Sequence, residues 1–269
     1  MSIQTTWVSY GQEHGFFAFP ERARAPLPAV IVIQEAWGVD AHIEDVARRY
    51  AGAGYAAFAP DLYAQGGTRP EPLSRERLAK LQAFVNTMPA RSWTDPEARK
   101  TALASYAEPD RNAIEESLGA MMGKVGKPAE LVPKLLEAAR FLRTENELTR
   151  GAKVVSVGYC LGGGLSGLLA CHDPELAAAA IYYGTSPPAD LIPKIACPVV
   201  GLYGGNDARV NATIPAFEEA MKAHGKRFAK HVYDGAEHAF NNDGRPSYDA
   251  RAARDAFRRT LDLFGDALG

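Results

Sequence analysis

The residues best placed for covalent chemistry form the motif Gly158-Tyr159-Cys160-Leu161-Gly162. A β-branched run precedes the motif and small, apolar residues typical of a helix follow it, so Cys160 falls at a tight strand-to-helix turn in a Gly-x-nucleophile-x-Gly pattern. The flanking glycines let strand and helix pack without Cβ clashes, and the turn projects its side chain at the sheet edge where open α/β sheets bind ligands. We therefore interpret Cys160 as a nucleophile. The plainer alternative is a glycine-rich turn with an incidental buried cysteine.

The same turn also favours activation of the sulfur and stabilisation of a reaction intermediate. A side chain at a helix N-terminus lies in the partial positive charge of the helix dipole, which favours the thiolate of Cys160. The N–H of Leu161 is free to donate a hydrogen bond to the oxyanion of an acyl-transfer intermediate. Leu161 is therefore our first candidate oxyanion donor.

A nucleophile also needs a base and a group that orients the base, and His238 and Asp207 are the candidates. His238 follows the expected last strand, residues 230–233, and Asp207 lies in the turn after the expected strand at 198–203. Nucleophile, acid and base then occur in the order typical of α/β-hydrolases. In this arrangement Asp207 fixes the tautomer of His238, and His238 handles the proton of the thiol and of the leaving group. Taken singly, each is more simply a turn-forming aspartate or a surface histidine. The other histidines lack such placement and are interpreted as structural or solvated: His14, His42, His172, His224 and His231.

One further carboxylate, Glu35, closes an apolar strand at residues 29–34. A charge in that place is unfavourable unless it is partnered or functional. The loop that begins there is also expected to supply the second oxyanion donor, the N–H of Ala36. A solvated glutamate at a strand end is the alternative interpretation.

Alternating strands and helices are expected to position these side chains. Several apolar runs do not alternate with polar residues, which is typical of strands covered on both faces of a parallel sheet. Between them, apolar residues recur at helical spacing, as in Leu131, Leu135 and Leu142. The same spacing recurs near the C-terminus, in Ala253, Phe257 and Phe264. We predict a doubly wound, mostly parallel α/β sheet preceded by an antiparallel hairpin. The expected strands are residues 7–10, 15–19, 29–34, 55–59, 153–158, 178–183, 198–203 and 230–233.

Residues 65–130 interrupt this rhythm, being polar and rich in proline. Two helices are predicted there, at 74–86 and 111–122. We treat residues 1–269 as one domain with this segment as a helical excursion, which is either a cap over the active site or a surface elaboration without catalytic role.

Composition excludes several classes of protein. The 269 residues carry a net charge of −2, without the basic excess of a nucleic-acid or membrane-surface protein. No apolar run is long enough to span a membrane and no export signal is visible, so we expect a cytoplasmic protein that binds neither nucleic acid nor membrane. Cys171 and Cys197 are interpreted as small buried hydrophobes, because three cysteines with these spacings suggest neither a disulfide framework nor a zinc site. A dinucleotide-binding protein is disfavoured, since Gln34-Glu35-Ala36 stands where a glycine-rich turn is required.

Together these motifs resemble the dienelactone hydrolase family, the carboxymethylenebutenolidases. The resemblance implies an α/β-hydrolase fold without metal or cofactor, with Cys160 as nucleophile, His238 as base and Asp207 as orienting acid. It also implies that Glu35 hydrogen-bonds the resting thiol and that the Leu161 and Ala36 amides bind the oxyanion. The matching segments are Gln34-Glu35-Ala36-Trp37-Gly38-Val39, Pro60-Asp61-Leu62-Tyr63, Gly158-Tyr159-Cys160-Leu161-Gly162-Gly163, residues 205–207 and Glu237-His238-Ala239-Phe240.

The chain departs from the family pattern at the substrate carboxylate. Family members that hydrolyse dienelactone hold that carboxylate with arginines, and one of these lies four residues after the histidine, where this chain has Asn242. A second lies on the helix after the Pro-Asp-Leu-Tyr segment, where Arg69, Arg75 and Arg77 all remain candidates. Asparagine does not offer the planar bidentate recognition of arginine, so the preferred substrate is expected to differ.

We therefore predict a cysteine-dependent hydrolase of small esters or lactones, acting through a thioester as a monomer or small homo-oligomer. A thioesterase or general carboxylesterase on the same triad is one alternative, and a catalytically silent binding or redox-sensing protein is another. The aromatic residues near the motifs are candidates for the substrate pocket, with structural core as the alternative: Trp37, Tyr63, Tyr159 and Phe240.

Overall fold

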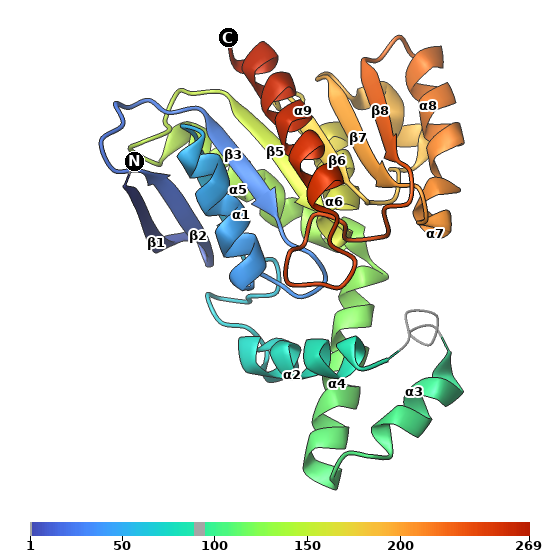
Figure 1. Ribbon diagram of the computed structural model, residues 1–269. Helices are drawn as coiled ribbons and strands as arrows, with labels where there is room; N and C mark the ends of the chain where they lie inside the picture. The colour runs from blue at the N-terminus through green and yellow to red at the C-terminus, as the bar shows by residue number, and fades with distance from the viewer. Residues whose placement is uncertain (1, 89–94) are drawn as a thin grey trace.

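A mixed sheet of eight strands forms the centre of the computed structural model, which describes residues 2–88 and 95–269 (Figure 1). The strand order is β1-β2-β4-β3-β5-β6-β7-β8. β1 and β2 form the antiparallel hairpin, β2 pairs antiparallel with β4, and the remaining neighbours are parallel. The fold is thus the predicted α/β-hydrolase fold, with hairpin strands longer than expected. The strands are β1 Ile3–Tyr10, β2 Glu13–Pro20, β3 Ala29–Ile33, β4 Ala56–Pro60, β5 Val154–Tyr159, β6 Ala179–Tyr182, β7 Val199–Gly204 and β8 Phe228–Tyr233.

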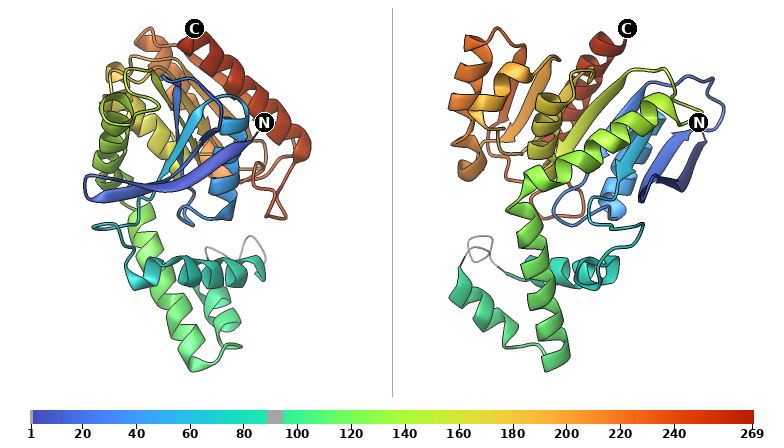
Figure 2. Two further views of the ribbon diagram at one scale, coloured as in Figure 1. Left: turned by 90° about the vertical axis from the view of Figure 1, so that its left-hand side faces the viewer. Right: turned by 180° about the vertical axis from the view of Figure 1, so that it is seen from behind.

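Helices cover both faces of the sheet, which explains why the central strands are apolar throughout. Along β3, Val30 and Val32 face a core with α1 and α9, whereas Ile31 and Ile33 face one with α5, α6 and α8. All five residues of β3 are buried, as expected for a strand covered on two sides. Figure 2 shows these helices on opposite sides of the sheet. The bounds are α1 Ala41–Gly52, α5 Val132–Thr144, α6 Leu161–His172, α7 Ala208–Asn211, α8 Ile214–Ala223 and α9 Ala250–Leu268, with a short 3₁₀ helix, η4, at Ala189–Lys194.

The predicted helical stripes are the buried faces of α5 and α9. Leu135 and Leu142 have no exposed surface, and Leu131 just before α5 is also buried. On α9, Ala253 and Phe264 are buried, and Phe257 packs partly buried against the same core. The apolar spacing in the sequence therefore identified the faces that hold both helices to the sheet.

The described part of the excursion at 65–130 forms its own small core beside the carboxyl edge of the sheet. The helices predicted at 74–86 and 111–122 correspond to α2 and α4, and the sequence did not predict α3. Arg77 joins α2 to α4, donating to Ser117 Oγ at 3.2 Å and to the Ala113 carbonyl at 2.8 Å. α3 and the far end of α4 project away from the sheet (Figure 2). The elements are η1 Glu71–Leu73, α2 Arg75–Asn86, α3 Pro96–Leu103, α4 Glu108–Val125 and η3 Pro128–Leu131.

None of the helices in the described part of the chain has both the length and the apolar character needed to cross a membrane.

Candidate active site

Cys160 occupies a strained turn between β5 and α6. Its φ of 56° and ψ of −112° lie in a region that non-glycine residues rarely adopt, and such strain is concentrated at functional sites. The turn is as tight as the flanking glycines imply. A Cβ on Gly158 would lie 1.7 Å from the Gly162 carbonyl oxygen, and a Cβ on Gly162 would lie 2.3 Å from the Ile33 carbonyl oxygen. The two glycines are therefore required by close backbone approach.

His238 and Asp207 come from separate loops and meet beside Cys160. Asp207 follows β7 and caps α7 by accepting the Val210 N–H at 3.3 Å. Its other oxygen, Oδ2, lies 2.5 Å from His238 Nδ1. The imidazole also makes a side-chain hydrogen bond with Cys160. The structure thus brings together three side chains from distant parts of the sequence, since Cys160 and His238 are 78 residues apart.

The electrostatics of this group favour a protonated imidazole. Burial by itself lowers the pKa of His238, but the negative charge of the Cys160 sulfur and the bond to Asp207 outweigh burial and raise the pKa to about 10. Burial likewise opposes ionisation of Asp207, yet its hydrogen bond and attraction to His238 bring the pKa of that carboxyl below its ordinary value. The arrangement therefore stabilises an imidazolium between two anionic groups.

Glu35 is buried next to this group, so it is not a solvated strand end. Glu35 is only 2% exposed. Both oxygens of its carboxylate accept hydrogen bonds. The Tyr183 hydroxyl donates to Oε1 at 3.2 Å and the Asn242 amide donates to Oε2 at 2.8 Å. Asn242, at the position of the family's arginine, therefore holds Glu35.

Tyr183 is the residue of this site that sequence reasoning missed. It has a φ of 38° and no exposed surface. Besides binding Glu35, its ring packs edge-on against the His238 imidazole with centroids 5.2 Å apart. In the sequence it ends the apolar run 178–183 and resembles ordinary core. Its positive φ, which marks it as special, has no signal in the sequence.

The two expected oxyanion donors lie at the same edge of the sheet. Leu161 is the first residue of α6, so its N–H has no acceptor within the helix. Ala36 lies in the turn closed by the Gly38 N–H donating to the Glu35 carbonyl at 3.3 Å. The Tyr63 hydroxyl donates to the Ala36 carbonyl at 2.8 Å, which anchors that turn.

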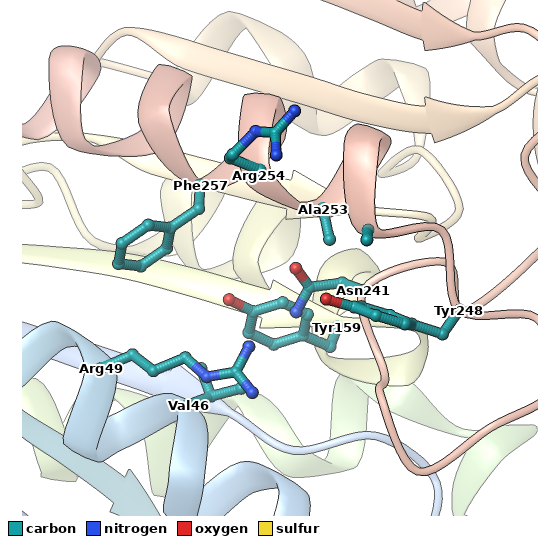
Figure 3. Close-up of a pocket in the computed structure, with 9 residues that line it drawn as sticks. Val46, Arg49, Tyr159, Asn241, Tyr248, Ala253, Arg254 and Phe257 are labelled. Carbon is teal, nitrogen blue, oxygen red and sulfur yellow. The ribbon is translucent and has the colours of Figure 1, made fainter.

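The four candidate pocket aromatics lie in different surroundings. Tyr63 and Phe240 have no exposed surface and pack in the hydrophobic core, which agrees with the structural alternative. Trp37 lines a cavity of about 350 Å³ beneath α2, together with Asn242. Tyr159 instead lines a separate cavity of about 140 Å³ between α1 and α9, where it faces Arg49 and Tyr248 (Figure 3).

The remaining cysteines are buried and unpaired. Burial raises the pKa of Cys171 to about 11 and that of Cys197 to about 12, so both stay as thiols. Within residues 2–88 and 95–269, no group of three His, Cys, Asp or Glu side chains is arranged to hold a metal ion.

The chain matches the model of the dienelactone hydrolase family over residues 14–268. It is 33% identical over 246 residues to a protein of Saccharolobus solfataricus named "Putative carboxymethylenebutenolidase", covering 91% of this chain and 90% of that protein. An Escherichia coli protein with the same name is 31% identical over 260 residues, covering 93% and 80% of the two chains.

Solved structures share the fold over the whole chain. The crystal structure of a "Putative Dienelactone Hydrolase" from Klebsiella pneumoniae superimposes with a TM-score of 0.72 at 28% identity, covering 98% of this chain and 99% of that one. A dienelactone hydrolase-like promiscuous phosphotriesterase from metagenomic libraries gives a TM-score of 0.74 at 22% identity, covering both chains completely. At that identity the second similarity concerns the fold alone.

Proposed function

The chain belongs to the dienelactone hydrolase family, and from this premise we propose that it hydrolyses small esters and lactones through Cys160, His238 and Asp207. The family consists of carboxylic ester hydrolases. The observation that carries the proposal is the hydrogen-bonded series from the Cys160 sulfur through His238 to Asp207 at the strained turn. A sulfur, an imidazole and a carboxylate in that order form the arrangement that nucleophilic acyl transfer requires.

In the first half of the reaction, the Cys160 thiolate attacks the acyl carbon. The carbonyl oxygen becomes an oxyanion and accepts hydrogen bonds from the Leu161 and Ala36 amides. Loss of one such donor typically lowers the rate by about 10²–10³-fold. As the carbon–oxygen bond breaks, the His238 imidazolium gives its proton to the leaving alkoxide. The products of this half are an alcohol, or the opened ring of a lactone, and a thioester with Cys160.

In the second half, water releases the acid. Once the sulfur is acylated, its negative charge no longer supports the imidazolium, so His238 is free to act as a neutral base. It takes a proton from water, whose oxygen attacks the thioester carbon. Collapse of the intermediate expels the Cys160 thiolate and restores the ion pair. Asp207 holds the imidazole in the required tautomer during both halves.

Glu35 is proposed as a positioning carboxylate for the resting site. Both of its oxygens are occupied by uncharged donors, Tyr183 and Asn242. Its carboxylate is therefore held by hydrogen bonds from uncharged donors, without a cation bonded to it in the described residues. Through Tyr183, whose ring packs edge-on against the imidazole, Glu35 helps to fix the surroundings of His238.

The test is the Cys160→Ala variant, assayed against aryl esters, lactones and thioesters. We expect kcat/KM to fall by about 10⁴–10⁶-fold on every substrate that the wild-type protein turns over. The matched control is Cys171→Ala, which removes a buried thiol remote from His238 and should leave turnover nearly unchanged. Wild-type turnover by Cys160→Ala would remove the mechanism, and the ranking of the three substrate classes distinguishes an esterase from a thioesterase.

We also propose that residues 1–269 form a single domain. Within this domain, α2 of the excursion at 65–130 acts as a cap over the active site. α2 supplies Arg75, Leu78 and Gln82 to the cavity that Trp37 and Asn242 also line. A helix that contributes the wall of a cavity beside Glu35 is placed to select substrates. This placement favours the cap over a surface elaboration.

A further inference from the structure

The cavity beneath α2 is lined by buried polar atoms that make no hydrogen bond with a described residue. It occupies about 350 Å³ between α2, the turn after β3 and the loop at 242–244. Arg69 Nη1 and both ring nitrogens of His42 are buried without a hydrogen-bond partner in the described part of the chain, and His42 Nδ1 has only a longer contact, 3.7 Å, with Asp243 Oδ1. The Arg69 side chain is 7% exposed and that of His42 is 6% exposed. Buried polar groups of this kind are normally satisfied, so the cavity is suited to a ligand that brings acceptor atoms.

The position of Arg69 is built into the backbone. Gly38 has a φ of 80°, and a Cβ there would lie 2.8 Å from the Arg69 guanidinium nitrogens. Arg69 Nη2 donates to the Val39 carbonyl at 3.2 Å, and Nε donates to Asp61 Oδ2 at 2.7 Å. These bonds fix the guanidinium and leave Nη1 as its unused donor.

The charges that surround the cavity do not favour an anion. Arg69 is paired with Asp61, and Arg75 forms an ion pair with Glu44. Asp40 also lines the cavity, where burial and the nearby negative charge of Glu35 raise its pKa. A ligand with a carboxylate would bring a further negative charge into a region where burial and Glu35 already oppose ionisation of the Asp40 carboxyl group.

From this juxtaposition we infer that the cavity binds an uncharged, oxygen-bearing end of the substrate's acyl group, and that it discriminates against an acyl group ending in a carboxylate. The inference rests on the proposed function, because the ligand is part of the substrate. The oxygen of a carboxamide, an ester or a hydroxyl group accepts hydrogen bonds from Arg69 Nη1 and from the N–H of His42 without adding charge.

The acyl group, rather than the alcohol, is the part assigned to this cavity. The alcohol leaves after the first half-reaction, whereas the acyl group remains bound to Cys160 until water attacks. The cavity is lined by Trp37, which follows the expected oxyanion donor Ala36, and by Asn242, which is bonded to Glu35, so it borders the turn on which the acyl carbonyl is expected to bind. Binding energy there acts throughout the reaction.

Arg245 is a further cation close to this region, besides Arg69 and Arg75. Its guanidinium lies 5.4 Å from the centre of the Trp37 ring, and its Nη1 is buried without a partner in the described residues. It is not one of the residues that line the cavity. The experiment therefore includes an Arg245→Gln variant.

The inference is tested with a matched pair of substrates. The p-nitrophenyl half-ester of glutaric acid ends in a carboxylate, and its terminal carboxamide analogue has nearly the same shape without the charge. We expect the wild-type protein to have a kcat/KM about tenfold higher or more for the carboxamide. A preference for the carboxylate overturns the inference, and if Arg245→Gln abolishes that preference, Arg245 is the group responsible.

A charge introduced into the cavity provides the second arm. Gln82→Lys places a cation on the lining of the cavity, and Ala83→Lys places one on an exposed neighbouring position of α2 that does not line it. We expect Gln82→Lys to shift the ratio of the two kcat/KM values toward the carboxylate by about tenfold, and Ala83→Lys to leave the ratio within about twofold. Equal shifts in both variants contradict the assignment. Thermal melting of both variants verifies that they are folded.

Direct binding separates this inference from the proposed function. The Cys160→Ala variant is titrated calorimetrically with the methyl ester of each acyl group. Tighter binding of the carboxamide supports the inference even if no ester is hydrolysed, whereas equal or tighter binding of the carboxylate overturns it. Hydrolysis that is independent of Cys160 overturns the mechanism and leaves this binding comparison intact.

Discussion

At the scale of single residues, the protonation of His238 connects structure to reactivity. Its pKa is raised to about 10, above the ordinary value of about 6.5, because the Cys160 sulfur and Asp207 outweigh the opposing effect of burial. A raised pKa in the folded state means that the ion pair stabilises the protein fully below pH of about 6.5 and loses this effect as the pH rises through about 10. The imidazolium is also the acid of the first half-reaction. Stability and acylation should therefore decline together at alkaline pH.

The first prediction concerns the pH profile of kcat/KM. We expect its alkaline limb to lie near pH 10 in the wild-type protein. In Asp207→Asn the limb should move to lower pH, because one of the groups that hold the proton on His238 is lost, and kcat should fall by about 10²–10⁴-fold. The measurement is a pH series with one activated ester. An unchanged limb in Asp207→Asn would show that Asp207 does not act through the imidazole.

The second prediction concerns Tyr183, a positioning residue that contacts both Glu35 and His238. Tyr183→Phe keeps the ring but leaves Glu35 Oε1 without its donor, so we expect kcat to fall by about tenfold and the protein to lose roughly 1–3 kcal/mol of stability. Tyr203→Phe is a matched control, since the hydroxyl of Tyr203 is buried without a partner in the described residues. If both variants retain full kcat, the bond to Glu35 has no catalytic role.

At the scale of elements, the contact between β3, β5 and α6 sets the position of the nucleophile. Gly162 lies against the backbone at the end of β3, and Gly158 lies against the first turn of α6. Both contacts are with backbone atoms, which cannot move aside as a flexible side chain does. The helix can approach the sheet this closely only because neither residue has a Cβ.

The third prediction follows from this contact. Gly162→Ala is expected to destabilise the protein by about 1–3 kcal/mol or more and to lower kcat, since the turn that carries Cys160 must shift. Gly119→Ala is the control, because Gly119 is exposed on α4 with nothing within 4 Å of its added Cβ. That change should stabilise the protein by about 0.5–1 kcal/mol. Chemical denaturation of both variants measures the difference, and equal stability of the two would contradict the close packing.

At the scale of the whole molecule, the excursion and the sheet are joined by a core of their own. Trp37 and Tyr63 from the sheet edge pack with Leu78, Phe84 and Ile114 from α2 and α4. Arg77 adds polar contacts between α2 and α4, reaching Ser117, which has no exposed surface. The excursion is thus attached through residues that also border the active site.

The fourth prediction tests this connection. Arg77→Ala should speed amide hydrogen exchange in α2 and α4 while leaving β3, β5 and β6 protected, because the lost contacts lie between the two helices. KM should rise several-fold with kcat less affected, since α2 forms a wall of the cavity. Hydrogen exchange with mass spectrometry and steady-state kinetics measure the two effects. Faster exchange throughout the sheet would show instead that the excursion is needed for the whole fold.

Fold class, family and the order of the chemical groups could all be predicted from the amino-acid sequence. Apolar runs and helical stripes are local patterns that burial imposes directly, so the parallel strands and the buried faces of α5 and α9 were predictable. The glycines around Cys160 were predictable for a similar reason, since a tight turn excludes Cβ atoms wherever it occurs. Cys160, Asp207 and His238 remain predictions of function, although the structure places them in contact.

The surroundings of Glu35 and the cavity beneath α2 could not be predicted before the chain was seen folded. Tyr183 and Asn242 reach Glu35 from positions 148 and 207 residues away, and no local pattern encodes such contacts. The sequence likewise left Arg69, Arg75 and Arg77 equivalent, whereas the structure gives them different carboxylate partners and leaves Arg69 with an unused donor in the cavity. The physical reason is that charge pairing depends on distances across the folded molecule, which the chain fixes only when its layers pack.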